Sequence, residues 1–377
     1  IQELQLNLEQ IEKGGYDHFM MKEIYEQPSV IKDTYRGRLL ANKGIIQMSG
    51  VEDNLEKFLN AKRILIVACG TSWHAGLVAE YIIEEFSRIP VEVEYASEFR
   101  YRNPIINKDD VVIAISQSGE TADTLAAIKL AKENGAFVFG VCNVVGSSIS
   151  RETHAGAYTH AGPEIGVAST KAFTTQIPIL PLLALRLAKA KGTMNNSDYQ
   201  RYLLELELIP EKVQEALLTN DVAKQIAEIY KDATNCLYLG RGYNFPGALE
   251  GALKLKEISY IHSEAYAAGE LKHGTISLIE QGTLVIGVLT QSELYEKTIS
   301  NMLECKSRGA YLMGLTTYRK YETEDQVNFT VYVPKVDEHF IGSLAVIPLQ
   351  LLGYYVSVAK GLDVDKPRNL AKSVTVE

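Results

Sequence analysis

Cysteine is scarce in this sequence, and the few cysteines present are widely separated. Four occur among 377 residues, with no Cys-x-x-Cys motif and no paired histidines. Zinc sites and disulfide frameworks need closer spacing, so neither is expected, and the pattern suits a reducing cytoplasm. Three of the four lie in strand-like apolar runs, where cysteine acts as a small buried hydrophobe. The four are Cys69, Cys142, Cys236 and Cys305.

The chain also lacks any block rich in lysine or arginine, and its net charge is −9. This argues against nucleic acid or an anionic membrane surface as the main partner, because both attract basic patches. An anionic ligand would have to be held by local geometry. With 46% hydrophobic residues the chain is too apolar to stay disordered, and its length suggests two domains.

One stretch, from Phe340 to Ala359, has no charged residue and therefore needs comparison with a membrane span. Pro348, Gln350 and two glycines within it weaken that interpretation. A helix that is buried on all sides of a folded domain has the same composition. We predict a core helix here and no membrane partner.

The chain contains an internal repeat. Four segments recur in the same order at offsets between 170 and 174 positions. The pairs are Ile64–Gly70 with Leu237–Gly240, Val111–Ser118 with Val285–Ser292, Phe137–Gly140 with Tyr311–Gly314, and Ile177-Pro178 with Ile347-Pro348. Four ordered matches at nearly constant spacing indicate a duplicated domain.

Each copy alternates short apolar runs with longer helical patterns. Thr121 to Asn134 is the clearest helix, with Leu125, Ile128 and Ala131 on one face and Gly135 as its stop. Buried strands that alternate with helices form parallel sheets covered on both faces. The sequence therefore predicts an α/β protein of two duplicated domains, each a parallel sheet flanked by helices.

The composition of the remaining segments suggests where these domains begin and end. The last residues carry Pro367 and Asn369 and are expected to form an irregular tail. The expected parts are a helical lead-in (1–45), a first domain (46–196), a charged connecting helix (197–220), a second domain (221–361) and a C-terminal tail (362–377).

A run of small polar residues from Ser116 to Thr121, Ser-Gln-Ser-Gly-Glu-Thr, lies between a predicted strand and a predicted helix. Ligands of open parallel sheets bind outside the carboxyl ends of strands, and a helix N-terminus attracts anions. Ser72, after the first strand of the same copy, could join this cradle. An ordinary capped turn fits the composition equally well. The second copy has Thr290-Gln291-Ser292-Glu293 here, which looks less suited to phosphate.

Glu250, Lys254 and Glu257 are spaced to share one face of a helix. Two carboxylates around an ammonium can hold a sugar and move a proton. Spacing alone favours an ordinary exposed Glu–Lys pair. His273, on a predicted loop, is a candidate acid or base, although a solvated surface histidine is the commoner case. Lys372 near the C-terminus is either solvated or an amine that forms a Schiff base.

Taken together, these residues resemble a known family. The chain is similar over nearly all of its length to the isomerase part of the glucosamine-6-phosphate synthases, the glutamine:fructose-6-phosphate amidotransferases. The matching segments, in order, are Cys69–Ser72, Ser116–Thr121, Glu164–Lys171, Ala248–Ser259, Ala265–Gly274 and Asp363–Glu377. Ser116–Thr121 alone would indicate only some sugar-isomerase domain, whereas the ordered set is highly specific.

The resemblance implies two sugar-isomerase domains and a role for each candidate residue. The phosphate of the sugar would be bound by Ser72, Ser116, Gln117, Ser118 and Thr121. The sugar itself would be lined by Val167, Ala168, Ser169 and Ala371. Ring opening would fall to His273, which in this family reaches a neighbouring subunit, so a homodimer is implied. The tail would close over the site.

The chemistry implied by the resemblance is an aldose–ketose shift on an imine. Lys372 would form the imine with carbon 2 of open-chain fructose 6-phosphate, and ammonia would then replace the lysine. Glu257 would carry the proton between carbon 1 and carbon 2, with Lys254 and Glu250 alongside. The product would be glucosamine 6-phosphate, and no metal or redox cofactor is implied.

The family also has an N-terminal glutaminase domain that supplies the ammonia, and these 377 residues contain no counterpart of it. Two other functions remain open at this point. One is a non-catalytic sugar-phosphate sensor, which would have no use for Glu257, His273 and Lys372 together. The other is a related sugar-phosphate isomerase that does not incorporate nitrogen, which the matching tail disfavours.

Overall fold

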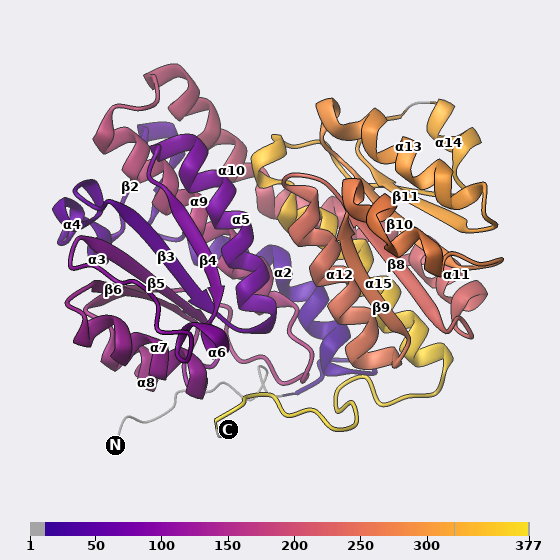
Figure 1. Cartoon of the computed structure of the whole chain (residues 1–377), viewed down its shortest axis with the longest axis horizontal. Coiled ribbons are helices and arrows are strands. Elements are labelled where there is room, and N and C mark those ends of the chain that lie inside the picture. Colours follow the sequence, from indigo (N-terminus) through magenta and orange to yellow (C-terminus); the bar gives the residue numbers. More distant parts are fainter. Residues whose placement is uncertain (1–11, 320, 376–377) are drawn as a thin grey trace.

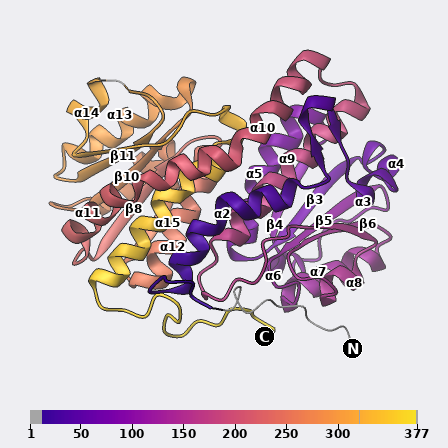
Figure 2. The ribbon, with the colours of Figure 1, turned by 180° about the vertical axis from the view of Figure 1, so that it is seen from behind.

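The computed structural model describes residues 12–319 and 321–375, which form two α/β domains side by side (Figure 1). The first domain, in indigo to magenta, lies beside the second, in pink to yellow. From behind, helices α2 and α10 run across the junction between them (Figure 2). The predicted fold class is confirmed.

The first domain is built on strands β3 to β7. Its elements are β3 (Arg63–Ala68), α5 (Gly70–Ser87), β4 (Val91–Tyr95), α6 (Ala96–Phe99), β5 (Asp110–Ser116), α7 (Ala122–Glu133), β6 (Phe137–Cys142), α8 (Ser148–Glu152), β7 (Ala155–Tyr158) and α9 (Lys171–Lys191). The strands are ordered β4-β3-β5-β6-β7, and every neighbouring pair is parallel.

The second domain repeats this arrangement. Its elements are α11 (Asn220–Tyr230), β8 (Asn235–Gly240), α12 (Asn244–Ser259), β9 (His262–Ala267), η3 (Ala268–His273), η4 (Thr275–Leu278), β10 (Leu284–Leu289), η5 (Ser292–Leu294), α13 (Tyr295–Lys306), β11 (Tyr311–Thr316), α14 (Tyr321–Gln326), β12 (Phe329–Tyr332), η6 (Glu338–Phe340) and α15 (Gly342–Ala359). The order β9-β8-β10-β11-β12, again all parallel, matches the first sheet strand for strand. The duplication read from the sequence is therefore present in the topology.

The described segment before strand β3 contains helices and two short strands. Its elements are α2 (Phe19–Tyr35), β1 (Leu39–Leu40), η1 (Ala41–Lys43), β2 (Ile45–Ile46), α3 (Ser49–Glu52) and α4 (Leu55–Leu59). The strands β1 and β2 form an antiparallel hairpin, with Gly44 at φ +65° in the turn. The composition of this segment does not predict the hairpin. Its strands are only two residues long, and its turn depends on a single glycine in the left-handed conformation. Residues 1–11 of the predicted lead-in lie outside the described part.

Two long helices link and fill the structure. The connecting segment is α10 (Asn196–Ala216), followed by η2 (Leu217–Thr219), close to the helix expected at 197–220. Helix α15 packs against α12, α11 and α10. By length and composition it could cross a membrane, yet 83% of that window is buried inside the protein. Its uncharged sequence therefore serves the core, as predicted for this stretch.

The C-terminal segment joins the two domains. Residues 362–375 form neither helix nor strand and run from the end of α15 back to the first domain (Figure 1). The Asp365 carboxylate accepts the backbone N–H groups of Phe19 and Met20 at the start of α2, both at 2.9 Å. Further along, the Val374 carbonyl accepts the N–H of Ala122 at 3.2 Å. The tail is thus anchored at both ends.

A cluster of charged and polar side chains around His339 also connects the two domains. His339 Nδ1 bonds the carboxylate of Asp337, and Nε2 lies 3.1 Å from Glu85 Oε1 on α5. Arg201 on α10 pairs with Asp337 at 2.6 Å, and the Tyr243 hydroxyl donates to Glu85 at 2.5 Å. Burial acts to lower the pKa of His339, but Asp337 and Glu85 raise it above its ordinary value.

This cluster predicts a pH dependence of stability. A raised pKa in the folded state means that the stabilising charge is fully present below the unfolded pKa, near 6.5. The contribution is lost as pH rises through the folded pKa. We expect the free energy of unfolding, measured by urea titration at several pH values, to fall above pH 6.5. The fall should disappear in His339→Gln and persist in His262→Gln, whose histidine is exposed. An unchanged slope in His339→Gln would contradict this account.

Candidate active site

The crevice of the first domain lies where its strand order reverses. From β3 the chain passes to β4 on one side and afterwards to β5 on the other, so adjacent strands β3 and β5 lead to helices that start at the same edge. Helix α5 begins at Gly70 and α7 at Ala122. Such switch points are where open α/β sheets bind ligands, and the two helix N-termini favour an anion.

The loop that follows β5 is held in shape by its own side chains. Ser116 Oγ accepts the N–H of Gly119 at 3.0 Å and lies 3.2 Å from Thr121 Oγ1. Ser118 Oγ accepts the N–H of Glu120 at 3.2 Å. Gly119 has φ +69°, and a Cβ there would collide with Ser147 Oγ. Only glycine fits this turn, so the loop is a preformed cradle of hydroxyl and N–H groups.

A cavity of about 430 Å³ opens over this cradle. Most of the predicted site residues line it, namely Ser72, Ser116, Gln117, Ser118, Thr121, Val167, Ser169, Glu257, Ala371 and Lys372. They come from β5 and its loop, from α5, from the loop before α9, from α12 of the second domain and from the tail. The fold thus brings together in one cavity side chains that lie as far apart in the sequence as Ser72 and Lys372.

The side chain of Lys372 is held in place by an ion pair. Its Nζ donates to Glu164 Oε2 at 2.5 Å and to the Gly166 carbonyl at 2.8 Å. The Glu164 side chain is completely buried and also accepts the N–H groups of Thr170 and Ala172, at 2.8 and 3.0 Å. Burial acts to raise the pKa of Glu164, yet the Lys372 ammonium and these N–H groups hold it below its ordinary value.

The three residues on α12 form a buried ionic cluster at the junction of the domains. Lys254 Nζ lies 2.5 Å from Glu257 Oε2 and 3.4 Å from Glu250 Oε1. Glu250 also accepts the Thr71 hydroxyl at 3.1 Å and lies 2.7 Å from His74 Nδ1, both on α5. Burial would lower the pKa of Lys254, but the charges of Glu257 and Glu250 raise it above its ordinary value.

Glu250 and Lys254 on α12 are not the exposed pair that their spacing alone favours, so that interpretation is wrong. The side chains of Glu250 and Lys254 are 0% exposed. Sequence cannot show that α5 of the other domain covers this face of the helix. Only Glu257, with 21% of its side chain exposed, reaches the cavity.

Four predicted site residues lie outside the cavity lining. Glu250 and Lys254 sit behind Glu257, and Ala168 is buried in the apolar core. His273 ends η3 in the second domain and is exposed to solvent. The structure of the single chain therefore does not bring His273 to the other candidates.

Some residues at the site were not singled out from the sequence. Tyr95 lines the cavity and stacks on Trp73 with ring centroids 4.0 Å apart. Ser97 and Asp123 line it as well. Glu164 belongs to one of the segments that resemble the known family, but the sequence assigned it no role. Its burial next to a lysine would indicate a functional residue, and that contact is visible only in the folded structure.

The equivalent loop of the second domain is occupied by a side chain of the protein itself. Glu338 Oε1 accepts both the N–H and the hydroxyl of Ser292, each at 2.8 Å. These are the groups that would bind an anion, so a carboxylate already satisfies them. The expectation that this second loop suits phosphate less well has a physical basis in this contact.

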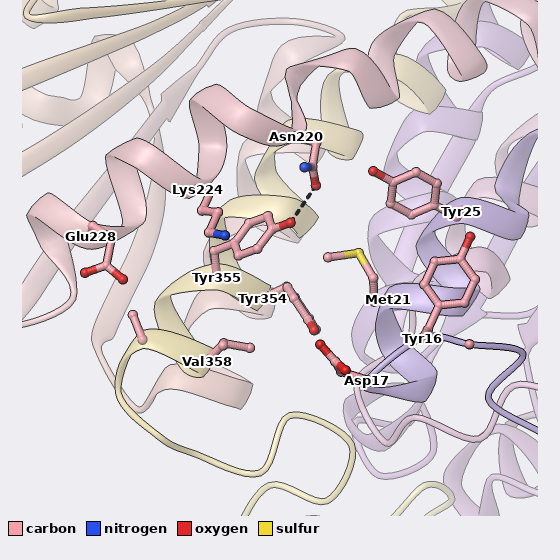
Figure 3. A pocket seen from close by; sticks show the side chains of 12 residues that line it. Tyr16, Asp17, Met21, Tyr25, Asn220, Lys224, Glu228, Tyr354, Tyr355 and Val358 are labelled. Atoms are coloured by element: carbon pink, nitrogen blue, oxygen red, sulfur yellow. Dashed lines mark hydrogen bonds between the residues drawn. The ribbon is translucent and has the colours of Figure 1, made fainter.

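A second cavity, of about 510 Å³, lies between α2, α11 and α15 (Figure 3). Four tyrosines and the charged Asp17, Lys224 and Glu228 surround it. The Tyr355 hydroxyl donates to Asn220 Oδ1 at 2.7 Å, as the dashed line shows. None of the predicted site residues lines this cavity.

Within residues 12–319 and 321–375, no group of three or more His, Cys, Asp or Glu side chains is arranged to hold a metal ion. The four cysteines are free thiols.

The sequence pattern of the SIS domain family matches residues 57–186 and 229–360, which are the two α/β domains. The chain belongs to the SIS domain family. Its two SIS domains place the candidate site in the first copy, with Glu257 contributed by the second copy and Lys372 by the tail.

Within the SIS domain family, the chain is similar to curated proteins of one kind. The chain is 57% identical over 377 residues to a glutamine–fructose-6-phosphate aminotransferase (isomerizing) of Chlorobaculum tepidum, and 55% identical to that of Bacteroides thetaiotaomicron. It spans 61% of the length of each relative. Among solved structures, the C-terminal domain of glucosamine-fructose-6-phosphate aminotransferase from Francisella tularensis has a TM-score of 0.89 and 41% identity, covering 94% of this chain and 100% of that one.

The buried cluster on α12 leads to a prediction on stability. Glu250→Ala leaves the buried Lys254 ammonium with one carboxylate and removes the partner of His74. Breaking a buried ion pair in this way should cost about 3–5 kcal/mol of unfolding free energy, measured by urea titration. The control Lys256→Ala, exposed on the same helix, should change it by less than about 0.5 kcal/mol. Equal effects of the two variants would contradict the role given to the cluster.

Proposed function

We propose that this SIS domain pair converts fructose 6-phosphate and ammonia into glucosamine 6-phosphate. One observation carries the proposal: a single cavity combines an anion cradle, an amine on the tail and a carboxylate on a rigid helix. The relatives named above are isomerizing aminotransferases of fructose 6-phosphate, and this chain covers 61% of their length. The reaction of the whole relative is therefore part of the proposal.

The phosphate end of the sugar would lie in the cradle. The hydroxyls of Ser116 and Thr121 lie 3.2 Å apart, and Ser118 lines the same cavity. Gln176 Nε2 donates to Ser72 Oγ at 3.0 Å and so fixes the orientation of that hydroxyl. Preformed donors at two helix N-termini bind a phosphate without a net positive surface, which suits a chain of charge −9.

Carbon 2 of the open-chain sugar would meet Lys372. A lysine amine attacks a ketone to form an imine, which ammonia can then replace. The tail carries Lys372 into the cavity between Ala371 and Ser373, and the Ser373 hydroxyl bonds Ser118 Oγ at 3.1 Å. The amine and the cradle are thereby held at one relative position.

The proton shift between carbon 1 and carbon 2 would use Glu257. A proton carried between neighbouring carbons needs one carboxylate at a fixed place on one face of the sugar. The ion pair with Lys254 locks the Glu257 side chain, and Lys254 is in turn held by Glu250. The two buried residues would therefore act by positioning Glu257.

Ring opening by His273 requires a second subunit. His273 is exposed on η3 and does not line the cavity of its own chain. We propose that the protein is a homodimer in which each His273 completes the partner's site. Ammonia would come from a glutaminase domain, as the resemblance to the glucosamine-6-phosphate synthases implies, or from ammonium added to the solution.

Two variants test the proposed chemistry. The protein should turn over fructose 6-phosphate, and NMR with and without added ammonium distinguishes glucosamine 6-phosphate from glucose 6-phosphate as the product. Lys372→Ala should abolish turnover, and Glu257→Gln should lower it about 10²–10⁴-fold, the range for a lost acid–base group. Neither variant should weaken the binding of sugar phosphate, measured by calorimetry, because the cradle is intact.

Other outcomes would change the assignment. Glucose 6-phosphate alone would mean that ring opening and proton transfer occur without nitrogen entry. Saturable binding without any product would favour a sugar-phosphate sensor. Unchanged turnover in Glu257→Gln would contradict the proton-transfer role.

Mixing inactive variants tests the shared site. His273→Ala and Lys372→Ala should each be inactive, but heterodimers of the two contain one site with both residues intact. When equal amounts of the two variants exchange subunits, about half of the dimers are heterodimers, and each heterodimer has one active site out of two. About a quarter of the wild-type activity should therefore return. No recovery in a mixture shown to exchange subunits, by native mass spectrometry, would place His273 outside the partner's site.

A further inference from the structure

The buried carboxylate of Glu164 is the feature that the proposed reaction has not used. Its Oε2 contacts Lys372 Nζ at 2.5 Å, and the side chain is 0% exposed. Its Oε1 accepts the backbone N–H groups of Thr170 and Ala172. The carboxylate is therefore fixed from one side by the start of α9 and faces the lysine on the other.

An ammonium cannot attack a carbonyl, so the proton of Lys372 needs a destination before the imine forms. The two acceptors at Lys372 Nζ are Glu164 Oε2 and the Gly166 carbonyl oxygen. A peptide carbonyl is a very weak base, whereas a carboxylate is a competent one. The two carboxylates that line the cavity have other partners: Glu257 bonds Lys254 on α12, and Asp123 pairs with Arg100.

We propose that Glu164 is the base that removes the proton from Lys372 and later gives that proton to the hydroxyl that leaves carbon 2 as water. This role rests on the proposed imine at Lys372. Two carboxylates then divide the chemistry. Glu164 serves the nitrogen of Lys372, and Glu257 serves the carbons of the sugar. Glu164 qualifies as a catalytic residue because it contacts a reacting atom.

The Lys372 ammonium gives a proton to the Glu164 carboxylate, which leaves a neutral amine and a carboxylic acid. The amine nitrogen bonds to carbon 2, the carbonyl electron pair moves to oxygen, and one proton passes from nitrogen to that oxygen. The Glu164 acid then protonates the hydroxyl, the carbon–oxygen bond breaks, and water leaves. The products are a protonated imine, water and the regenerated carboxylate.

A second carboxyl, that of Glu23, lies beside Glu164 and is also buried. Glu23 on α2 accepts the N–H groups of Ile165 and Gly166, at 2.5 and 3.2 Å, directly beside Glu164. Burial, and next the charge of Glu164, raise the pKa of Glu23 to about 7. Protonation of Glu164 removes that repulsion, which offsets part of the cost of taking the proton from Lys372.

The test is the rate at which the imine is trapped. Wild-type protein with fructose 6-phosphate and cyanoborohydride should acquire a reduced sugar adduct on Lys372, located by mass spectrometry. In Glu164→Gln the trapping rate at neutral pH should fall about 100-fold or more, because the general base is lost. The rate should recover as pH rises, because hydroxide then deprotonates the lysine. A merely structural role of Glu164 would not produce this pH dependence.

The control removes a comparable ion pair close by. Glu26 on α2 pairs with Lys171 at 2.7 Å, so Glu26→Gln neutralises a carboxylate next to a lysine without contacting Lys372. Its trapping rate should equal the wild-type rate at every pH. A third variant, Glu164→Asp, keeps a carboxylate and should trap faster than Glu164→Gln at neutral pH.

The outcomes separate the two proposals. No adduct on wild-type protein would refute the imine and with it the proposed function. An adduct on wild-type protein that forms equally fast in Glu164→Gln would overturn the role of Glu164 alone. If Glu164→Gln fails to bind sugar phosphate, the comparison passes to Glu164→Asp. A Glu164→Asp rate with no wild-type-like pH profile would then overturn the proposal as well.

Discussion

The site depends on burying one ammonium, that of Lys254, at the junction of the two domains. A charge without water needs carboxylate partners, and Glu250 and Glu257 supply them from the same helix at 3.4 and 2.5 Å. Glu250 is shared with Thr71 and His74 on α5, so satisfying the charge also docks the domains. Glu257 is left at the cavity wall in one orientation. The same contacts therefore hold the fold together and place the carboxylate.

The duplication supplied two similar crevices, and only the first has an open cradle. In the second copy, the Glu338 carboxylate already takes the two donors of Ser292. The second domain instead contributes α12, whose face is turned toward the first crevice. The tail completes the arrangement, because it leaves α15 and crosses back to the first domain with Lys372 (Figure 1). One site is thus made from both copies.

Much of the fold could be read from the sequence. The ordered repeat predicted two parallel sheets, and the uncharged run that became α15 was predicted as core. The hairpin of β1 and β2 was missed because it rests on two-residue strands and one left-handed glycine, Gly44. On α12, spacing predicted that Glu250 and Lys254 share a face but wrongly favoured an exposed pair. Whether a helical face is buried depends on the element packed against it, here α5.

The sequence by itself predicted the class of chemistry through its resemblance to a known family, while the composition of the candidate loop fits an ordinary capped turn equally well. The Ser116–Thr121 loop takes part of its conformation from bonds within its own six residues, and contacts with Ser148 and Ser373 add to them. Only the tertiary structure decided which charges meet. The partnership of Lys372 with Glu164, 208 positions apart, follows from the path of the tail across the domain junction. Local conformation is encoded by neighbours in the chain, whereas ion pairs between distant segments exist only once packing has brought them together and excluded water.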